Sequence, residues 1–225
     1  GGRCRWVRSK NGHQMTTVSK YDLDRIVDHA GIHSDMGNLK LQLLAESFVA
    51  AHALVPDGLS VEVGTRAGGS ALLQLLLMGH MYCTTKRPLL FTIDPYGGKP
   101  YMKNNCKLYD LPVYGAAKMN LALFATHVHY MMTSQDYLKH VADLGYWWGG
   151  VARQVKRLAF VLLDGAHDAD TVDMELQGFM PRVAPGGRIL IDNVAMDPAV
   201  WPLLQKYGPT PLTKDHDLCV VEKTK

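Results

Sequence analysis

The stretch LSVEVGTRAGGSALL, residues 59–73, decides the fold. A short apolar strand carrying Glu62 is predicted to run into a glycine-rich turn, after which Ser70 opens an apolar helix. An open α/β sheet holds a nucleotide-like ligand in this way, because the exposed N–H groups at the start of the helix attract anionic groups. Gly64 and Gly68 lack a Cβ, so the backbone can approach such a ligand closely.

The glycine spacing excludes two common phosphate-binding loops. Gly64, Gly68 and Gly69 match neither the GxGxxG pattern of dinucleotide folds nor a GxxxxGK[ST] loop. Taken alone, the stretch is also compatible with a plain connecting turn. The acidic Glu62 before the turn, and the residues at the later strand ends, favour a ligand site.

The composition is that of an ordinary globular protein. The 225 residues are 47% hydrophobic and carry a formal net charge of +3, which suits one α/β domain with an N-terminal extension. This charge is too small to indicate nucleic-acid binding, and no basic stripe with interleaved aromatic residues is present. The longest apolar run, residues 71–78, is much shorter than the roughly 20 residues that cross a bilayer. We therefore expect neither a membrane nor a nucleic-acid partner.

The cysteines are typical of a protein from a reducing compartment. They lie far apart and form no CxxC pair, at Cys4, Cys83, Cys106 and Cys219. This pattern predicts neither a zinc site nor a disulfide framework. Because no signal peptide is evident either, a cytoplasmic location is expected.

The chain is predicted to divide into an N-terminal part, residues 1–55, and an α/β domain, residues 56–225. Residues 1–18 are polar and predicted to be irregular. Helices are predicted over residues 21–30 and 39–54 from their apolar spacing. These helices would pack on the sheet edge, cover the ligand or mediate contact in a homodimer, and the sequence does not choose among the three.

From residue 59 onward, apolar strands alternate with helices. Strands are predicted at residues 59–63, 89–94, 128–133, 158–163, 187–192 and 217–222. Helices are predicted at residues 69–80, 113–126, 135–145, 169–181 and 198–206. This alternation predicts a doubly wound, mostly parallel sheet with right-handed crossovers.

The carboxyl ends of the second and third strands carry polar residues, and ligands bind at those ends in such sheets. The carboxylate of Asp94 would accept hydrogen bonds from both ribose hydroxyls of an adenosine. Alternatively, Asp94 forms a turn before a proline. Ser134 and Gln135 would reach an adenine edge, although Ser134 or Asp136 could instead cap the next helix.

A second group of polar residues follows the fourth and fifth predicted strands. Asp164 and His167 follow one strand, and Asp192 and Asn193 follow the next. Two carboxylates and an amide oxygen are hard donors that suit Mg²⁺. Singly, each residue has a plainer explanation as part of a turn or helix start, and Asp168 is expected to cap the following helix. Together they predict a metal site with a histidine beside it.

Four segments in order, EVGTRAGGSA, IDPYGGKP, LLDGAHDADTV and PRVAPGGRILIDN, resemble the class I O-methyltransferases that use S-adenosylmethionine (SAM), of the macrocin O-methyltransferase-like, methyltransferase family 24 type. The likeness covers about residues 40–223. It implies a Rossmann-like α/β fold with a doubly wound, mostly parallel seven-stranded sheet. Asp164 and the Asp192-Asn193 pair are also similar to the metal ligands of catechol and caffeoyl-CoA O-methyltransferases.

The resemblance implies roles for individual residues. The expected SAM-binding residues are Glu62, Gly64, Thr65, Gly68, Ser70, Asp94, Ser134 and Gln135. Asp164, Asp192 and Asn193 would hold Mg²⁺ or another divalent cation. Catechol-type enzymes have a lysine three residues after the first metal aspartate, whereas this chain has His167. His167 and Asp164 are therefore the expected catalytic residues, with histidine suited to accept a proton at neutral pH.

The expected acceptor is a small molecule whose hydroxyl has a vicinal oxygen, such as a sugar diol or a catechol, because a metal can bind both oxygens. Five aromatic residues either wall a pocket for its ring or belong to core and surface: Tyr96, Tyr101, Tyr114, Trp147 and Trp148. Two alternatives remain open. One is a metal-independent methyltransferase of the same fold acting on another acceptor, and the other is a non-catalytic SAM-binding module.

Overall fold

The computed structural model describes the chain in four main segments and four short strands. The main segments are residues 18–82, 87–96, 111–143 and 157–224. The short strands, described by their backbone, are β1 (Trp6–Arg8), β2 (Gln14–Thr16), β6 (Tyr146–Trp148) and β7 (Val151–Arg153).

A seven-stranded sheet forms the centre of the molecule, in the order β10-β11-β9-β8-β3-β4-β5. Its strands are β3 (Leu59–Val63), β4 (Leu90–Ile93), β5 (His127–Tyr130), β8 (Leu158–Leu163), β9 (Val183–Asp192), β10 (Thr210–Pro211) and β11 (Leu218–Glu222). The pairs formed among β9, β8, β3, β4 and β5 are parallel, and β11 and β10 add antiparallel pairs. The predicted doubly wound, mostly parallel seven-stranded sheet is confirmed.

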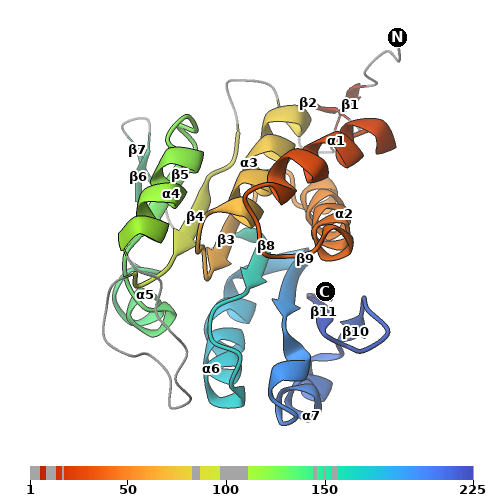
Figure 1. Cartoon of the computed structure of the whole chain (residues 1–225), viewed down its shortest axis with the longest axis vertical. Coiled ribbons are helices and arrows are strands. Elements are labelled where there is room, and N and C mark those ends of the chain that lie inside the picture. The colour runs from red at the N-terminus through yellow and green to blue at the C-terminus, as the bar shows by residue number, and fades with distance from the viewer. Residues whose placement is uncertain are drawn as a thin grey trace.

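Helices cover both faces of the sheet (Figure 1). One layer holds α1 (Lys20–Gly31), α2 (Asn38–Leu54), α3 (Gly69–Met81) and α4 (Leu111–Leu121), and the other holds α5 (Ser134–His140), α6 (Ala169–Phe179) and α7 (Val200–Leu204). Short 3₁₀ turns follow at η1 (Met180–Arg182), η2 (Val194–Met196) and η3 (Gln205–Tyr207). Alternate residues of the central strands enter opposite cores, as Phe160 and Val161 do.

The N-terminal helices are built into the first of these cores. Val27 of α1 and Phe48 of α2 belong to the same buried cluster as Phe160 of the sheet. The buried imidazole of His52 on α2 lies 2.8 Å from the Tyr82 hydroxyl and 2.8 Å from the Ser60 hydroxyl. Burial lowers the pKa of His52 to about 3, so the ring is neutral. The two helices therefore pack on the sheet, and dimer contact through their outer surfaces stays a prediction.

Several predicted boundaries were wrong, and two hairpins were missed. Strands β1 and β2 pair antiparallel within the segment predicted to be irregular, and β6 pairs with β7. Each hairpin has a turn dipeptide in its sequence, Asn11-Gly12 and Gly149-Gly150, which was the available signal. Helix α5 ends at His140 rather than residue 145, and α7 gives way to a 3₁₀ turn at Gln205.

The structure shows which of the polar residues near helix starts act as N-caps. Asp168 caps α6 as predicted, since its carboxylate accepts a hydrogen bond from the N–H of Thr171 at 3.0 Å. Neither Ser134 nor Asp136 is the cap of α5, which corrects that alternative. Thr133 is the N-cap, and its hydroxyl accepts from the Asp136 N–H at 3.0 Å while donating to the Asp136 carboxylate at 2.8 Å.

A fully buried glutamate, Glu175 on α6, makes stability depend on pH. Removal from water raises the pKa of Glu175 from its ordinary 4.5 to about 8, although the nearby Ser134 hydroxyl of α5 opposes the shift. Between these two values the folded chain holds a proton that the unfolded chain releases. The free energy of unfolding therefore falls as pH rises through this window.

We predict that Glu175→Gln raises the melting temperature by several degrees at pH 8 and changes it little at pH 5, because glutamine has no proton to retain. Thermal unfolding at the two pH values measures this. Glu46→Gln, at an exposed position of α2, is the matched control and should shift neither value. An equal change from Glu175→Gln at both pH values would contradict the assignment.

Candidate active site

The carboxyl ends of β3 and β8 meet at the point where the chain order in the sheet reverses. Gly64 follows β3 with a φ of +85°, and a Cβ built on it would lie 2.0 Å from the carbonyl oxygen of Asp164. The N–H of Asp164 also donates to the Val63 carbonyl at 2.9 Å. A glycine is therefore required at position 64 for a reason other than ligand approach, because the ends of β3 and β8 touch there.

Glu62 and Ser70, both expected at the cofactor, bind each other behind the glycine turn. The Ser70 hydroxyl donates to one carboxylate oxygen of Glu62 at 3.1 Å, and the Gln74 amide donates to the other at 2.5 Å. All three side chains are buried. Desolvation, with Asp164 nearby, raises the pKa of Glu62 well above its usual value. These contacts fix the first turn of α3 against β3, which shapes the glycine turn from behind.

Asp94 lies across the front of the same turn. Its carboxylate accepts hydrogen bonds from the backbone N–H of Arg66 at 3.0 Å and of Tyr96 at 3.2 Å. Burial raises the pKa of Asp94, and the bonds from backbone N–H groups partly offset that rise. A carboxylate has about four lone-pair directions, so these two contacts leave acceptor capacity for ligand hydroxyls.

The remaining predicted cofactor residues differ in their surroundings. Thr65 is buried, and its hydroxyl has no hydrogen-bond partner within the described part of the chain. Gly68 is the N-cap of α3 with a φ of +86°, and a Cβ built on it would lie 3.1 Å from Leu121 of α4. Ser134 is buried beside Glu175, whereas Gln135 is exposed. The structure therefore brings Thr65, Gly68 and Asp94 together at the turn and directs Ser134 toward α6.

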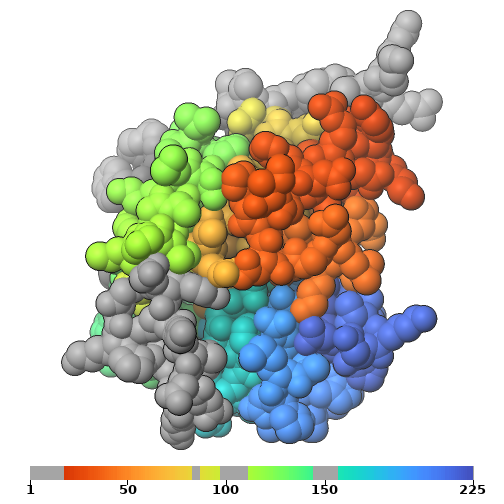
Figure 2. Space-filling model, in the orientation of Figure 1, coloured from red at the N-terminus to blue at the C-terminus, as the bar shows by residue number. Residues whose placement is uncertain are grey.

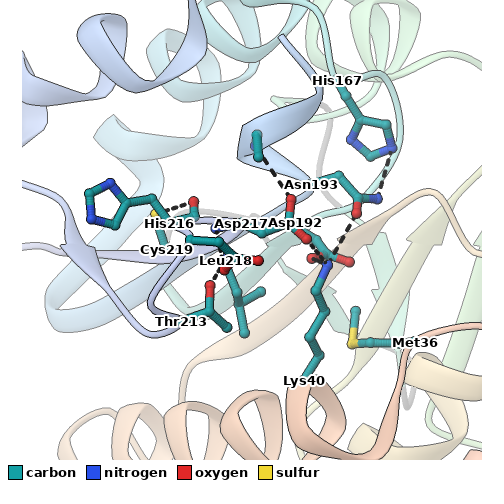
Figure 3. A network of polar contacts seen from close by, with 12 residues as sticks. Met36, Lys40, His167, Asp192, Asn193, Thr213, His216, Asp217, Leu218 and Cys219 are labelled. Carbon is teal, nitrogen blue, oxygen red and sulfur yellow. Dashed lines mark hydrogen bonds and ion pairs between the residues drawn. The ribbon is translucent and has the colours of Figure 1, made fainter. Parts of the chain in front are cut away.

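Asp164, Asp192 and Asn193 gather at the ends of β8 and β9, as predicted, with a lysine that the sequence reasoning missed. The Lys40 ammonium group lies 2.6 Å from Asp192 Oδ1, 3.1 Å from Asn193 Oδ1 and 2.5 Å from Asp217 Oδ2 (Figure 3). Burial alone would lower the pKa of Lys40, but its bonds to Asp192 and Asp217 bring the pKa above its usual value.

The missed residues had weak signals in the sequence. Lys40 and Glu46 are the charged residues of an otherwise largely apolar helix, which marks Lys40 as unusual. Asp217 lies immediately before β11, a strand whose direction relative to β9 the sequence did not fix. Because Leu218 is paired with Asp192 across the two strands, Asp217 lies beside the end of β9.

His167 joins this group through Asn193. The Nδ2 atom of Asn193 lies 3.3 Å from His167 Nε2, and Asn193 itself has a left-handed backbone with φ of 55°. Desolvation lowers the pKa of His167, although nearby Asp192 opposes the shift. Desolvation and the charge of Asp192 both raise the pKa of Asp164 well above its usual range.

The oxygens of Asp164, Asp192 and Asn193 are donors of the type that Mg²⁺ prefers, but their arrangement does not form a metal site. Within the described residues, no group of three or more His, Cys, Asp or Glu side chains is arranged to hold a metal ion. Asp164, Asp192 and Asp217 with Lys40 carry a formal charge of −2 when all are ionised. Lys40 already neutralises part of this charge and lies against Asp192, Asn193 and Asp217, so a divalent cation at this corner stays a prediction.

Of the five aromatic residues considered for a pocket or for core and surface, the structure describes the side chains of Tyr96 and Tyr114. Tyr96 is buried, donates its hydroxyl to the Arg66 carbonyl and lies 5.0 Å from the Tyr114 ring, between centroids. It therefore supports the glycine turn. Tyr101 and the side chains of Trp147 and Trp148 lie outside the described residues.

A separate hollow of about 560 Å³ lies on the outer side of the glycine turn. It is lined by residues 32–35 of the α1–α2 loop, by Arg66 and Ala67, and by one side of α4. In the space-filling view, orange surface is visible between the green of α4 and the red of α1 (Figure 2). None of the predicted acids lines this hollow, so it is distinct from the acidic corner.

A family model described as a methyltransferase domain, Methyltransf_24, matches residues 61–194. The match spans the glycine turn, Asp94, and both acidic strand ends. This chain belongs to that methyltransferase family. No curated protein matches it by sequence.

Solved structures agree on the fold. The O-methyltransferase NovP superposes with a TM-score of 0.68 at 16% identity, over 92% of this chain and 100% of NovP. The O-methyltransferase TomG from Streptomyces achromogenes, in complex with SAM, gives 0.54 at 17% identity over 92% of each chain. SAH-bound PaMTH1 from Podospora anserina gives 0.54 at 12% identity, over 92% of this chain and 89% of PaMTH1.

These comparisons confirm the family and the class I methyltransferase fold that the four segments implied. No helix in the described part of this methyltransferase is long and apolar enough to cross a membrane. The individual site residues, the metal and the cytoplasmic location stay predictions.

We predict that Gly64→Ala lowers the melting temperature by roughly 10 °C or more, or yields insoluble protein, because its Cβ would overlap the Asp164 backbone at positive φ. Thermal unfolding of purified protein measures this. Gly115→Ala on α4, where nothing lies within 4 Å of the added carbon, is the control and should be neutral or stabilising by about 1 kcal/mol. Equal behaviour of the two variants would count against the close contact.

Proposed function

We propose that this methyltransferase transfers the methyl group of SAM to a hydroxyl oxygen of a small molecule. The observation that carries the proposal is the position of His167, Asp164 and Asp192 beside the glycine turn of a methyltransferase fold. Solved structures of similar fold include two proteins named as O-methyltransferases, one of them in complex with SAM, and a methyltransferase bound to SAH.

The glycine turn and Asp94 have features that suit SAM. Asp94 is buried and rigidly held, yet retains acceptor capacity for the two ribose hydroxyls. The unpartnered Thr65 hydroxyl and the backbone N–H groups at the start of α3 are available to polar groups of the ligand. Glu62 and Ser70 would act indirectly, by holding α3 in place. Ser134 and Gln135 would border the adenine, although Ser134 also contacts Glu175.

The reaction needs a base and an oriented acceptor. Bound SAM supplies an electrophilic methyl group, whose bond to sulfur breaks as its bond to the acceptor oxygen forms, leaving S-adenosylhomocysteine. His167 would accept the proton that leaves the hydroxyl, because its ring lies at the same corner as Asp164 and Asp192. Asp164 would orient the acceptor from the end of β8.

Asp164, Asp192 and Asn193 would hold Mg²⁺ or another divalent cation. Their oxygens are hard donors of the kind that such ions prefer. When bound, such an ion lowers the pKa of an attached hydroxyl and orients it. An acceptor with vicinal oxygens, a sugar diol or a catechol, would suit this arrangement best.

The primary experiment is calorimetric titration with SAM, with and without Mg²⁺, followed by mass-spectrometric detection of methylated catechol or sugar diols. SAM binding and metal-dependent methylation support the whole proposal. Methylation that survives EDTA would favour the metal-independent alternative. SAM binding with no transfer to any acceptor class would favour a non-catalytic SAM-binding module.

We predict that Asp94→Asn weakens SAM binding by roughly tenfold or more, because the amide replaces a charge-assisted acceptor of the ribose hydroxyls. Calorimetry measures the dissociation constant. Asp143→Asn, at an exposed position after α5, should leave SAM binding unchanged. An unaltered dissociation constant for Asp94→Asn would remove the ribose assignment.

We predict that His167→Ala lowers kcat by about 10²- to 10⁴-fold with little change in SAM affinity, because the variant loses the proton acceptor only. Steady-state rates and calorimetry on the same sample separate the two effects. The exposed His140 at the end of α5 provides the control variant His140→Ala. Full activity of His167→Ala would transfer the base role to another group.

A further inference from the structure

The hollow on the outer side of the glycine turn has the size and lining of a small-molecule site. Its volume of about 560 Å³ lies within the usual range of ligand pockets. It lies between α4 and the end of α1 (Figure 2), and apolar side chains line much of it: Ile32, Pro112, Val113, Ala116 and Met119. In such pockets a few polar groups fix the orientation of the ligand, so these groups indicate what the hollow binds.

Two of the polar groups at the hollow carry opposite charges. Arg66 of the glycine turn and Asp35 of the α1–α2 loop form an ion pair there. Their side chains are 37% and 68% exposed, and an ion pair this exposed contributes little to stability. A ligand that offers a carboxylate to Arg66 and an ammonium group to Asp35 can therefore replace the pair easily. An α-amino acid carries both of these groups on one carbon.

Arg66 is held in a backbone conformation that an arginine rarely adopts. Its φ is +45°, in the left-handed region that glycine enters without strain. Its N–H donates to the Asp94 carboxylate at 3.0 Å, and its carbonyl accepts from the Tyr96 hydroxyl. The next carbonyl, of Ala67, accepts from the Asn120 amide at 2.8 Å. These bonds fix the direction in which the side chain leaves the turn, and strain held in this way is typical of ligand-binding positions.

The same residue joins the hollow to the proposed ribose site. The backbone of Arg66 contacts the Asp94 carboxylate, and its side chain lines the hollow. A single ligand can therefore place a diol at Asp94 and a zwitterion at the Arg66–Asp35 pair. SAM has its groups in this order, since its sulfur links the ribose to an α-amino acid.

Asp35 is held at the turn by close packing of its loop. A Cβ on Gly69 would lie 2.5 Å from the Cβ of Ser34 and 2.6 Å from the carbonyl oxygen of His33. The loop therefore packs directly on the first residue of α3. The Ser34 hydroxyl also accepts from the Met36 N–H at 3.1 Å, which closes a turn around Asp35. Within the described part of the chain, Asp35 provides the only carboxylate that lines the hollow.

We infer that the hollow holds the amino-acid end of SAM, with Arg66 on the α-carboxylate and Asp35 on the α-ammonium group. The inference rests on the proposed function. The ion pair between the two side chains opens as the ligand enters, and each side chain then contacts the opposite charge of the zwitterion. A guanidinium group binds a carboxylate through two parallel N–H···O bonds, so Arg66 also orients the chain that leads to the sulfur.

The test measures the binding of three adenosine compounds by calorimetry. S-adenosylhomocysteine carries the whole amino acid, its decarboxylated form keeps only the amine, and methylthioadenosine has neither group. The variants are Arg66→Asn and Asp35→Asn. Asparagine tolerates the left-handed backbone better than most residues, so Arg66→Asn removes the charge without adding strain.

We expect Arg66→Asn to weaken S-adenosylhomocysteine binding by about 10- to 100-fold, the effect of losing a hydrogen bond between charged groups. The same variant should not weaken the binding of the decarboxylated form or of methylthioadenosine. Asp35→Asn should weaken both compounds that carry the amine by about tenfold, and should leave methylthioadenosine within about twofold of wild type.

A matched control is available in the exposed ion pair between Arg157 and Asp57. Their side chains are 52% and 37% exposed, and they lie just before β8 and β3, at the opposite edge of the sheet. Arg157→Asn and Asp57→Asn should change none of the affinities. If Arg66→Asn does not fold, Asp35→Asn, at an exposed loop position, is judged by the comparison of the amine compounds with methylthioadenosine.

Two results would overturn the inference. One is S-adenosylhomocysteine affinity in Arg66→Asn and Asp35→Asn equal to that of wild type. The other is an equal loss for S-adenosylhomocysteine and methylthioadenosine, which would mean a general distortion of the turn. In both cases wild type still binds S-adenosylhomocysteine, and the proposed function stands. A wild type that binds none of the three compounds would overturn the proposed function, and the inference with it.

Discussion

The close contact between the ends of β3 and β8 is the constraint on which the site depends. Gly64 can touch the Asp164 backbone only because it lacks a side chain and accepts a positive φ. That contact places the glycine turn, the proposed cofactor side, against the strand end that carries Asp164. Two regions a hundred residues apart thereby become one site, at the point where the order of the sheet reverses.

Acidic side chains gathered at one edge of a sheet repel one another, and the structure reduces this repulsion in two ways. Glu62 is buried and Asp164 is partly buried, and desolvation raises the pKa values of both carboxyl groups. Asp192 and Asp217 instead share the Lys40 ammonium group. An ion pair in a partly buried place stabilises when its remaining hydrogen bonds are satisfied, and Asn193 supplies the third acceptor for Lys40.

The N-terminal helices pack on the sheet and supply Lys40 to the acidic corner. Phe48 and His52 anchor α2 in the core of the sheet. This rigid attachment allows Lys40, at the exposed end of the same helix, to hold a fixed position over β9. A binding site is most accurate when its side chains project from such packed elements. The acidic corner is therefore completed by the part of the chain that precedes the family match.

The sequence by itself determined the alternation of the main strands and helices, the family, and the residues at the strand ends. Apolar periodicity and glycine position are local properties, so Gly64, Asp94, Asp164 and Asp192 could be placed without a structure. Only the tertiary structure decided which side chains meet. The pairing of Lys40 with Asp192 joins residues 152 positions apart. The N-cap of α5 is Thr133, and Ser134 faces Glu175 of α6. Such contacts depend on how helices pack on the sheet, which no local pattern encodes.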